Sequence, residues 1–183
     1  MIQVELRAFL KPDEYKNLIE KYNNILHTEK QINYFYNSKK DFRFIKTKRY
    51  CELCIKQGDM HDSIKNEKVV KIDTEYMENL SDILYSLGYI PEVKWFRTRS
   101  SAKLDFGFDM CLDYTVGYGY IIEISKDIED ENNVDLAKIE LGNFLESLDI
   151  DLTPKEVFDE KYQEYTSNWI ELTSKVDEEK FLK

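Results

Sequence analysis

The chain has 183 residues, of which 42% are hydrophobic and 14% aromatic, and its formal net charge is −10. That length suits one domain with a sizeable core, and the hydrophobic content excludes a wholly disordered chain. The acidic balance disfavours generic binding to nucleic acid or anionic membranes, although a local cluster of basic residues can still dominate its own cavity. No uncharged apolar stretch approaches the roughly 18 residues of a membrane span, and the N-terminus lacks the features of a signal peptide. We therefore expect a cytoplasmic protein.

The first two thirds of the chain predict strands with few helices between them. Apolar and polar residues alternate over residues 2–9, which indicates a strand, and Pro12 then suits the first turn of a helix that ends near Tyr22. Asp73 and Gly88 are suited to begin and end a second helix. The other expected strands cover residues 31–37, 42–48, 50–57, 64–72, 92–100, 104–114 and 118–125.

The last third predicts two helices. One follows the acidic residues 127–135 and ends near Leu148, and the other begins at a capping-box pattern, Thr153 to Glu156. The aromatic residues between Phe158 and Trp169 are expected to pack over the outside of the sheet or to contact a second copy of the chain. Residues 1–183 are expected to form one domain, with 171–183 as a weakly ordered tail. Because short turns join most strands, the pattern favours an antiparallel α+β sheet or barrel.

Nearly every expected strand has one apolar face and one face that mixes carboxylates with basic side chains. Glu5 and Arg7 share such a face in the first strand, and Arg97 and Arg99 share one in a later strand. Two architectures fit this pattern. In an open sheet the charged face is simply exposed to water. In a closed barrel covered by helices, the charged faces line a tunnel with basic groups for an anion and carboxylates for a divalent cation.

Cys51 and Cys54 form a C-x-x-C pattern, which is also typical of zinc and redox sites. Here both cysteines lie in an expected strand, where residues three apart point to opposite faces. We therefore interpret them as small, half-buried residues without a metal or redox role.

Seven segments resemble, in the same order, motifs of the CYTH superfamily, the triphosphate tunnel metalloenzymes. The most specific is Cys111 to Ile124, which is similar to the family's Leu-Asp-x-x-x-Gly-x-Gly-x-x-x-Glu-Ile-Glu ending. Gln3 to Arg7 resembles its Glu-x-Glu-x-Lys strand. The remaining matches lie at residues 41–44, 52–56, 65–67, 87–89 and 94–99.

The resemblance implies a fold and a set of site residues. The fold is α+β, a closed eight-stranded antiparallel barrel with helices packed on the outside, and the family's enzymes use magnesium or manganese. The residues that would bind the phosphates of a substrate are Arg7, Arg43, Lys56, Lys65, Arg97 and Arg99. The implied metal ligands are Glu5, Glu67 and Glu123, and the implied catalytic residues are Glu5, Glu123 and Arg97. Asp113 would support the site by holding a basic side chain.

The chain departs from the family pattern at four positions. Gln3 and Ser125 stand where the family has glutamates, Val69 stands where a further glutamate is common, and Arg7 replaces the usual lysine. Neutral Gln and Ser side chains bind magnesium weakly. We therefore expect weaker metal binding than is usual for the family, with one metal or none.

The leading functional hypothesis is a phosphohydrolase that acts on an inorganic, nucleoside or other organic triphosphate with a divalent metal. One alternative is a class IV-type adenylyl cyclase that makes cyclic AMP from ATP, because this reaction needs the same kind of phosphate binding. The other is a catalytically weakened module that binds a nucleotide or polyphosphate. The expected partner is thus a triphosphate-bearing small molecule or polyphosphate, without membrane or generic nucleic-acid binding, and a homodimer is left open.

Overall fold

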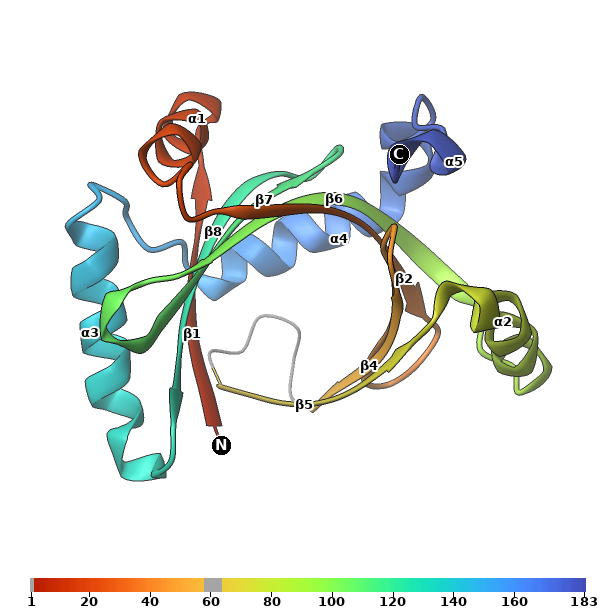
Figure 1. The fold of residues 1–183 in the computed structure, drawn as a ribbon, viewed down its shortest axis with the longest axis horizontal. Helices are drawn as coiled ribbons and strands as arrows, with labels where there is room; N and C mark the ends of the chain where they lie inside the picture. The colour runs from red at the N-terminus through yellow and green to blue at the C-terminus, as the bar shows by residue number, and fades with distance from the viewer. Residues whose placement is uncertain (1, 58–63) are drawn as a thin grey trace.

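The computed structural model describes the backbone of residues 2–57 and 64–183, with all their side chains except those of residues 57 and 64–67 (Figure 1). The strands of this part of the chain are β1 (Ile2–Leu10), β2 (His27–Tyr36), β3 (Asp41–Lys46), β4 (Cys51–Gln57), β5 (Ile64–Ile72), β6 (Pro91–Lys103), β7 (Phe108–Thr115) and β8 (Gly119–Ile128). The helices are α1 (Pro12–Lys21), α2 (Met77–Ser86), α3 (Val134–Glu146), α4 (Lys155–Leu172) and α5 (Glu178–Phe181). None of the described helices is both long and apolar enough to cross a lipid bilayer.

The eight strands pair antiparallel around a ring, in the order β1-β5-β4-β3-β2-β6-β7-β8. β1 pairs with β8 along its whole length, from Ile2 opposite Ile128 to Leu10 opposite Tyr120. On its other edge it pairs with β5 at two positions, Gln3 with Lys65 and Val4 with Ile64. The expected α+β fold with an eight-stranded antiparallel sheet is confirmed, whereas continuous closure along the β1–β5 seam stays a prediction.

Thr153 covers part of this seam, and the predicted capping box does not form. The Thr153 amide donates to the Arg7 carbonyl oxygen at 3.3 Å, and the Phe9 amide donates to Thr153 Oγ1 at 2.9 Å. α4 begins after Pro154 without a side-chain cap. The physical reason is that β1 extends beyond β5 and leaves backbone groups that need partners, so the Thr153 hydroxyl binds the strand instead of the helix.

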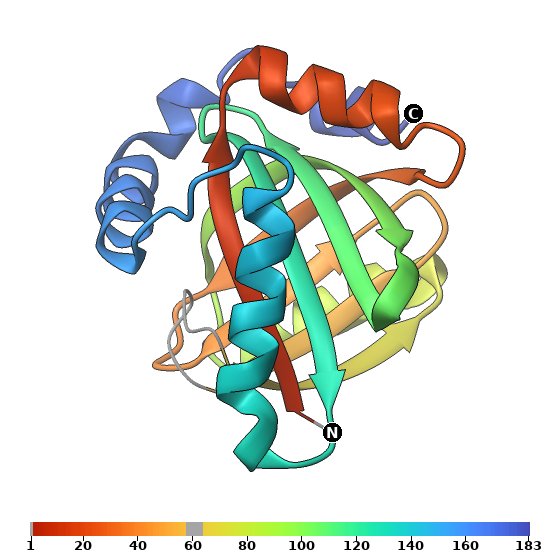
Figure 2. The same ribbon diagram turned by 90° about the vertical axis from the view of Figure 1, so that its left-hand side faces the viewer.

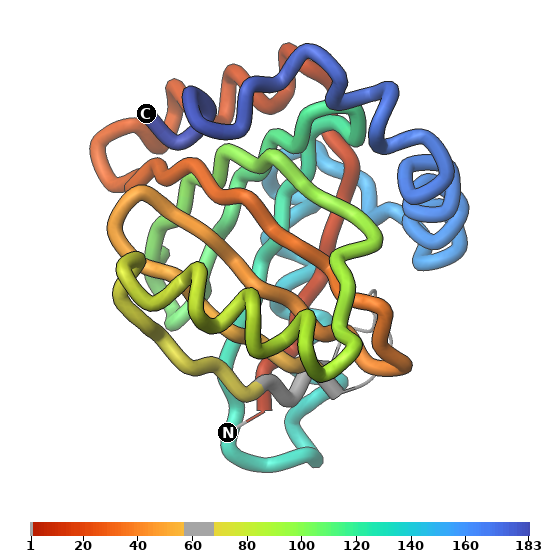
Figure 3. Tube along the Cα trace, turned by 90° about the vertical axis from the view of Figure 1, so that its right-hand side faces the viewer, coloured from red at the N-terminus to blue at the C-terminus, as the bar shows by residue number. Residues whose placement is uncertain are grey.

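Alternation along the strands separates an apolar outer face from a polar inner face. α1 and α3 cover β1, β7 and β8 on the outside (Figures 1 and 2). The outward side chains buried there include Val4, Ala8, Met110, Leu112, Ile122 and Ile124. α2 lies on the outer side of β2 and β3 (Figure 3). Its Leu84, Met77 and Leu80 belong to the apolar cluster that these strands form there.

The C-terminal residues include α5, which contacts the sheet, and the weak order expected of residues 171–183 stays a prediction. The rings of Phe181 and Phe96 lie with centroids 5.4 Å apart. Glu178 accepts a hydrogen bond from Lys94 Nζ at 2.7 Å and another from the Tyr34 hydroxyl. The sequence after α4 is short and polar overall, but these few anchors match outward side chains of β2 and β6 and hold α5 in place.

α4 lies across one end of the barrel, not over its outer face as expected (Figures 1 and 2). Phe158 and Tyr165 of this helix are 3% and 2% exposed. The Phe158 ring stacks on Phe9 with centroids 4.3 Å apart, and Tyr165 meets Trp95 edge to face. The cause is that the inward side chains at this end are apolar and aromatic, so the barrel end itself buries the aromatic stripe of α4.

Candidate functional site

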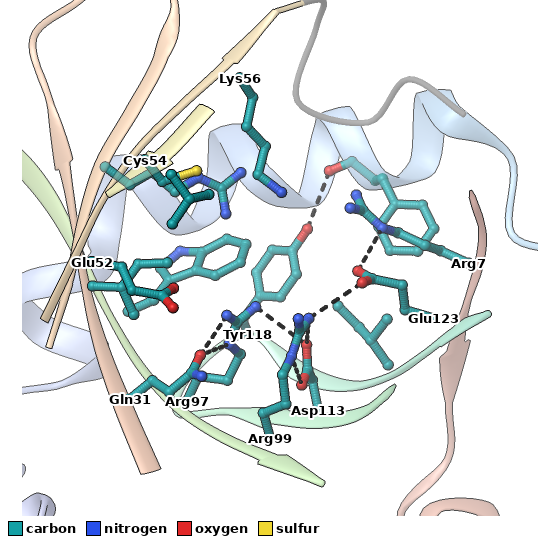
Figure 4. A pocket seen from close by; sticks show the side chains of 16 residues that line it. Arg7, Gln31, Glu52, Cys54, Lys56, Arg97, Arg99, Asp113, Tyr118 and Glu123 are labelled. Atoms are coloured by element: carbon teal, nitrogen blue, oxygen red, sulfur yellow. Dashed lines mark hydrogen bonds and ion pairs between the residues drawn. The ribbon is translucent and has the colours of Figure 1, made fainter. Parts of the chain in front are cut away.

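A polar cavity lies inside the barrel, and every strand contributes to its wall (Figure 4). Its volume of about 140 Å³ is roughly ten times the space that one water molecule needs. Half of the residues that line it are charged, and strand alternation places their side chains on the inner face: Arg7, Arg43, Glu52, Lys56, Arg97, Arg99, Asp113 and Glu123. A single small volume therefore concentrates basic groups from distant parts of the sequence.

Five of the six residues predicted to bind phosphate line this cavity. They are Arg7, Arg43, Lys56, Arg97 and Arg99. The sixth, Lys65, lies in β5 opposite Gln3, but its side chain is outside the described residues. Lys94, which is in the same basic segment as Arg97 and Arg99, points outward to Glu178. Strand alternation explains this difference, because Lys94 is an odd number of residues away from both arginines.

Asp113 holds two of the arginines in fixed orientations. Arg99 donates to it in a bidentate fashion, from Nε to Oδ1 at 2.8 Å and from Nη2 to Oδ2 at 2.6 Å. Arg97 Nη1 lies 3.3 Å from Asp113 Oδ2. Arg99 and Asp113 are direct partners in the β6–β7 register, so the strand pairing itself builds this contact. The carboxylate sets the direction of both guanidinium groups.

Of the two arginines that Asp113 holds, Arg97 has the less compensated positive charge. Its Nε and Nη2 atoms donate to Gln31 Oε1 at 3.2 and 2.6 Å, and this amide carries no negative charge. Burial, together with the positive charge of Arg99, lowers the pKa of Arg97 to about 10. Burial also acts against Arg99, but Asp113 outweighs it and raises the pKa of Arg99. Both guanidinium groups are charged at neutral pH, and an anion that reached Arg97 would relieve the repulsion between them.

Gln31 is a site residue that the sequence analysis missed. The signal was present, since alternation over residues 31–37 places Gln31 on the face opposite Ile32. Its neutral amide was not recognised because the family motifs that the chain resembles identify charged residues.

Arg43 occupies a second, separate position in the wall. Asp41 binds its guanidinium with both carboxylate oxygens, and the group stacks over the Phe35 ring at 4.7 Å. Burial would lower the pKa of Arg43, but the charge and hydrogen bonds of Asp41 raise it overall. Lys56 stands opposite Asp41 in the β3–β4 register and also lines the cavity. This side of the cavity therefore adds two cations that do not share Asp113.

The predicted metal ligands are arranged differently from a metal site. Arg7 lies between two of them, with Nε 3.1 Å from Glu123 Oε2 and Nη2 in close contact with Glu5. Ser125, a neutral residue, stands opposite Glu5 in the β1–β8 register. The side chain of Glu67 is outside the described residues. Among the residues that are described, no three His, Cys, Asp or Glu side chains converge on a point that could hold a metal ion. As arranged, the described residues do not fit a resident divalent metal.

The C-x-x-C cysteines point to opposite faces, as predicted. Cys51 is buried in the outer cluster under α2, whereas Cys54 lines the cavity. Neither of them forms a disulfide.

Aromatic side chains form the end of the cavity that α4 covers. Trp95, Tyr118 and Phe158 line it there, and the Tyr118 hydroxyl donates to the Phe158 carbonyl oxygen at 3.4 Å. Trp95 is 7% exposed and packs on Phe35 and Tyr118, and it also forms part of the cavity wall. The cavity thus has charged sides and an apolar end.

Comparison with known proteins identifies the family and the fold. The CYTH domain model matches residues 1–156. The structure is similar to a conserved hypothetical protein from Pyrococcus furiosus, with a TM-score of 0.68, 17% identity, and coverage of 84% of this chain and 96% of that one. For the PH1012 protein from Pyrococcus horikoshii OT3 the TM-score is 0.69, with 15% identity and coverage of 84% and 95%.

A third similar structure is that of HpAC1 from Hippeastrum, named as an adenylyl cyclase and found to have a dominant triphosphatase activity. Its TM-score is 0.59, with 17% identity and coverage of 85% of this chain and 93% of that one. Curated proteins gave no match. The structural similarities establish the fold, and the family model spans most of the chain. The chain therefore belongs to the CYTH domain family.

Proposed function

We propose that this chain is a tunnel phosphohydrolase that acts on a triphosphate-bearing small molecule or inorganic triphosphate. The observation that carries the proposal is the cavity itself, in which Arg7, Arg43, Lys56, Arg97 and Arg99 converge from four different strands. Few ligands other than a polyanion suit so many cations in so small a volume. In this proposal the β1–β5 seam is closed and the sheet acts as a tunnel.

The arginines would act by orientation and charge stabilisation. Arg97 and Arg99, fixed by Asp113, would hold one part of the phosphate chain, and Arg43 with Lys56 would hold another. Water would attack the terminal phosphorus, so that a new P–O bond forms as the bridging P–O bond breaks. The terminal phosphoryl group becomes orthophosphate, the shortened phosphate chain leaves with the bridging oxygen, and the proton lost by water passes to the released phosphates or to solvent. Charge that develops on the phosphoryl and bridging oxygens would be met by guanidinium groups that are already in place.

Binding without turnover is a second candidate, and one observation favours it. Glu5 and Glu123 are the carboxylates predicted to be catalytic, and Arg7 binds both. Carboxylate oxygens that accept hydrogen bonds from a guanidinium are occupied and are poorly placed to take a proton from an attacking water. The chain would then sequester a triphosphate without cleaving it.

Phosphorus NMR distinguishes these functions. The protein is incubated with tripolyphosphate, ATP or thiamine triphosphate, each with magnesium, with manganese and with EDTA. Orthophosphate release supports the hydrolase, and cyclic AMP with diphosphate supports the cyclase alternative. Binding without any product supports the second candidate. If none of the three compounds binds or reacts, the proposed function is wrong.

The Arg97→Gln substitution tests whether the cavity arginines bind phosphate. It should weaken tripolyphosphate binding about 10- to 100-fold, because a charge-assisted hydrogen bond contributes about 1.5–3 kcal/mol. Lys16→Gln in α1 is the matched control, since Lys16 is exposed on the outside of the barrel and the charge change is the same. Isothermal titration calorimetry measures both variants. Equal affinities would show that the cavity is not where the anion binds.

A further inference from the structure

Arg7 is held between two carboxylates of the cavity wall by the strand register. Glu5 and Arg7 share the inner face of β1, and Glu123 lies directly opposite Arg7 in the β1–β8 pairing. The side chains of Arg7, Glu5 and Glu123 are 17%, 3% and 16% exposed, so solvent screens their interactions weakly. The backbone pairing therefore places these three side chains next to one another.

The third carboxylate of this region is also engaged. Asp113 binds Arg99 with both oxygens, and Arg99 Nη2 lies 3.5 Å from Glu123 Oε1. Glu5, Glu123 and Asp113 are thus balanced by guanidinium groups of the same wall, and Ser125 adds no further negative charge beside Glu5. A divalent cation that bound Glu5 and Glu123 would have to displace a guanidinium that cannot lose its proton near neutral pH.

We propose that Arg7 is the resident cation of this tunnel, in the place where a divalent metal would otherwise sit, and that the tunnel binds short polyphosphates as metal-free anions. The inference rests on the proposed binding of a triphosphate. It assigns to Arg7 the role of neutralising Glu5 and Glu123, so that these carboxylates do not repel the phosphate chain. Arg43, Lys56, Arg97 and Arg99 then contact the anion directly.

Two titrations of the wild-type protein test the inference. Tripolyphosphate, titrated by calorimetry in EDTA, should bind without added metal. Mn²⁺ alone, followed by electron paramagnetic resonance of the free ion, should show no stoichiometric site. Tripolyphosphate binding only with metal, or one Mn²⁺ bound per chain, would overturn the inference and leave the proposed function standing. If tripolyphosphate does not bind under either condition, the proposed function itself fails.

The Arg7→Gln variant supplies the converse test. Removing the guanidinium leaves Glu5 and Glu123 unbalanced, so Mn²⁺ affinity should rise at least about tenfold. Tripolyphosphate binding in EDTA should weaken, and Mn²⁺ should restore it. Arg7→Lys is the matched control, because it keeps the charge and should stay without a Mn²⁺ site.

Circular dichroism checks that both variants fold. A folded Arg7→Gln variant with no gain in Mn²⁺ affinity would refute the role given to Arg7, and the wild-type titrations decide the matter if the variant does not fold.

Discussion

Asn33 is a fully buried polar residue on the inner face of β2. It is 0% exposed, and neither its Oδ1 nor its Nδ2 atom has a hydrogen-bond partner among the described residues. A buried amide without partners costs about 1–3 kcal/mol. Asn33→Leu, which keeps the branched shape and the number of side-chain heavy atoms, should therefore raise the free energy of unfolding by about 1 kcal/mol or more, measured by urea denaturation. Asn33→Asp is the control and should destabilise the fold, because it buries a charge. A loss of stability in Asn33→Leu would show that the amide is satisfied in solution.

Strand alternation predicted which charged side chains share one face of each strand, and the family resemblance implied that these faces line a cavity. Glu5, Arg7, Arg97, Arg99 and Glu123 lie on the inner face because side chains of a strand alternate, whatever the partner strand is. The pairing of Arg7 with Glu123 could not be predicted, because it depends on the register of strands whose residues are 116 positions apart. The sequence therefore indicated the charges of the site but not which of them neutralise each other.

At the scale of elements, α5 depends on one carboxylate. Glu178 binds Lys94 and Tyr34, and these hydrogen bonds hold its pKa below the ordinary value of 4.5, although burial acts in the opposite direction. A carboxyl whose pKa is lowered by folding stabilises the protein above its unfolded-state pKa, and this contribution is lost as the pH falls through the folded-state value. Glu178→Gln should thus cost about 1 kcal/mol at pH 7, a modest value because the pair is partly exposed. The difference between variant and wild type should begin to shrink as the pH falls to about 4.5, and it should vanish once the pH is below the lowered pKa of Glu178. Thermal unfolding of variant and wild type, at pH 7 and at a pH below the lowered pKa of Glu178, measures this difference. A difference that persists at the lower pH would contradict this role of Glu178.

The helices show where prediction from a single sequence stops. Pro12 and Gly88 marked a helix start and a helix end correctly, because both signals are local: Pro12 is the first residue of α1, and Gly88 has a φ of 86° just after α2. The aromatic stripe of α4 was also visible in the sequence. Its position across the barrel end was not, because periodicity shows that a helix has an apolar face but not which surface buries it.

At the scale of the whole molecule, α4 makes the two ends of the barrel different. Phe158 and Trp95 close the cavity beneath this helix, and no described helix lies across the other end (Figure 1). If the tunnel holds a phosphate chain, the chain can enter from one side only and cannot thread through. Only the end of a phosphate chain can enter a tunnel that is closed at its far side, so phosphates in the middle of a long chain cannot reach the arginines. Long-chain polyphosphate should therefore bind about two proteins, one at each end, whatever its length. Analytical ultracentrifugation with polyphosphates of increasing length measures the number of bound proteins, and tripolyphosphate, which should hold a single protein, is the control. A number that grows with chain length would show that the tunnel is open at both ends, or that the anion binds outside it.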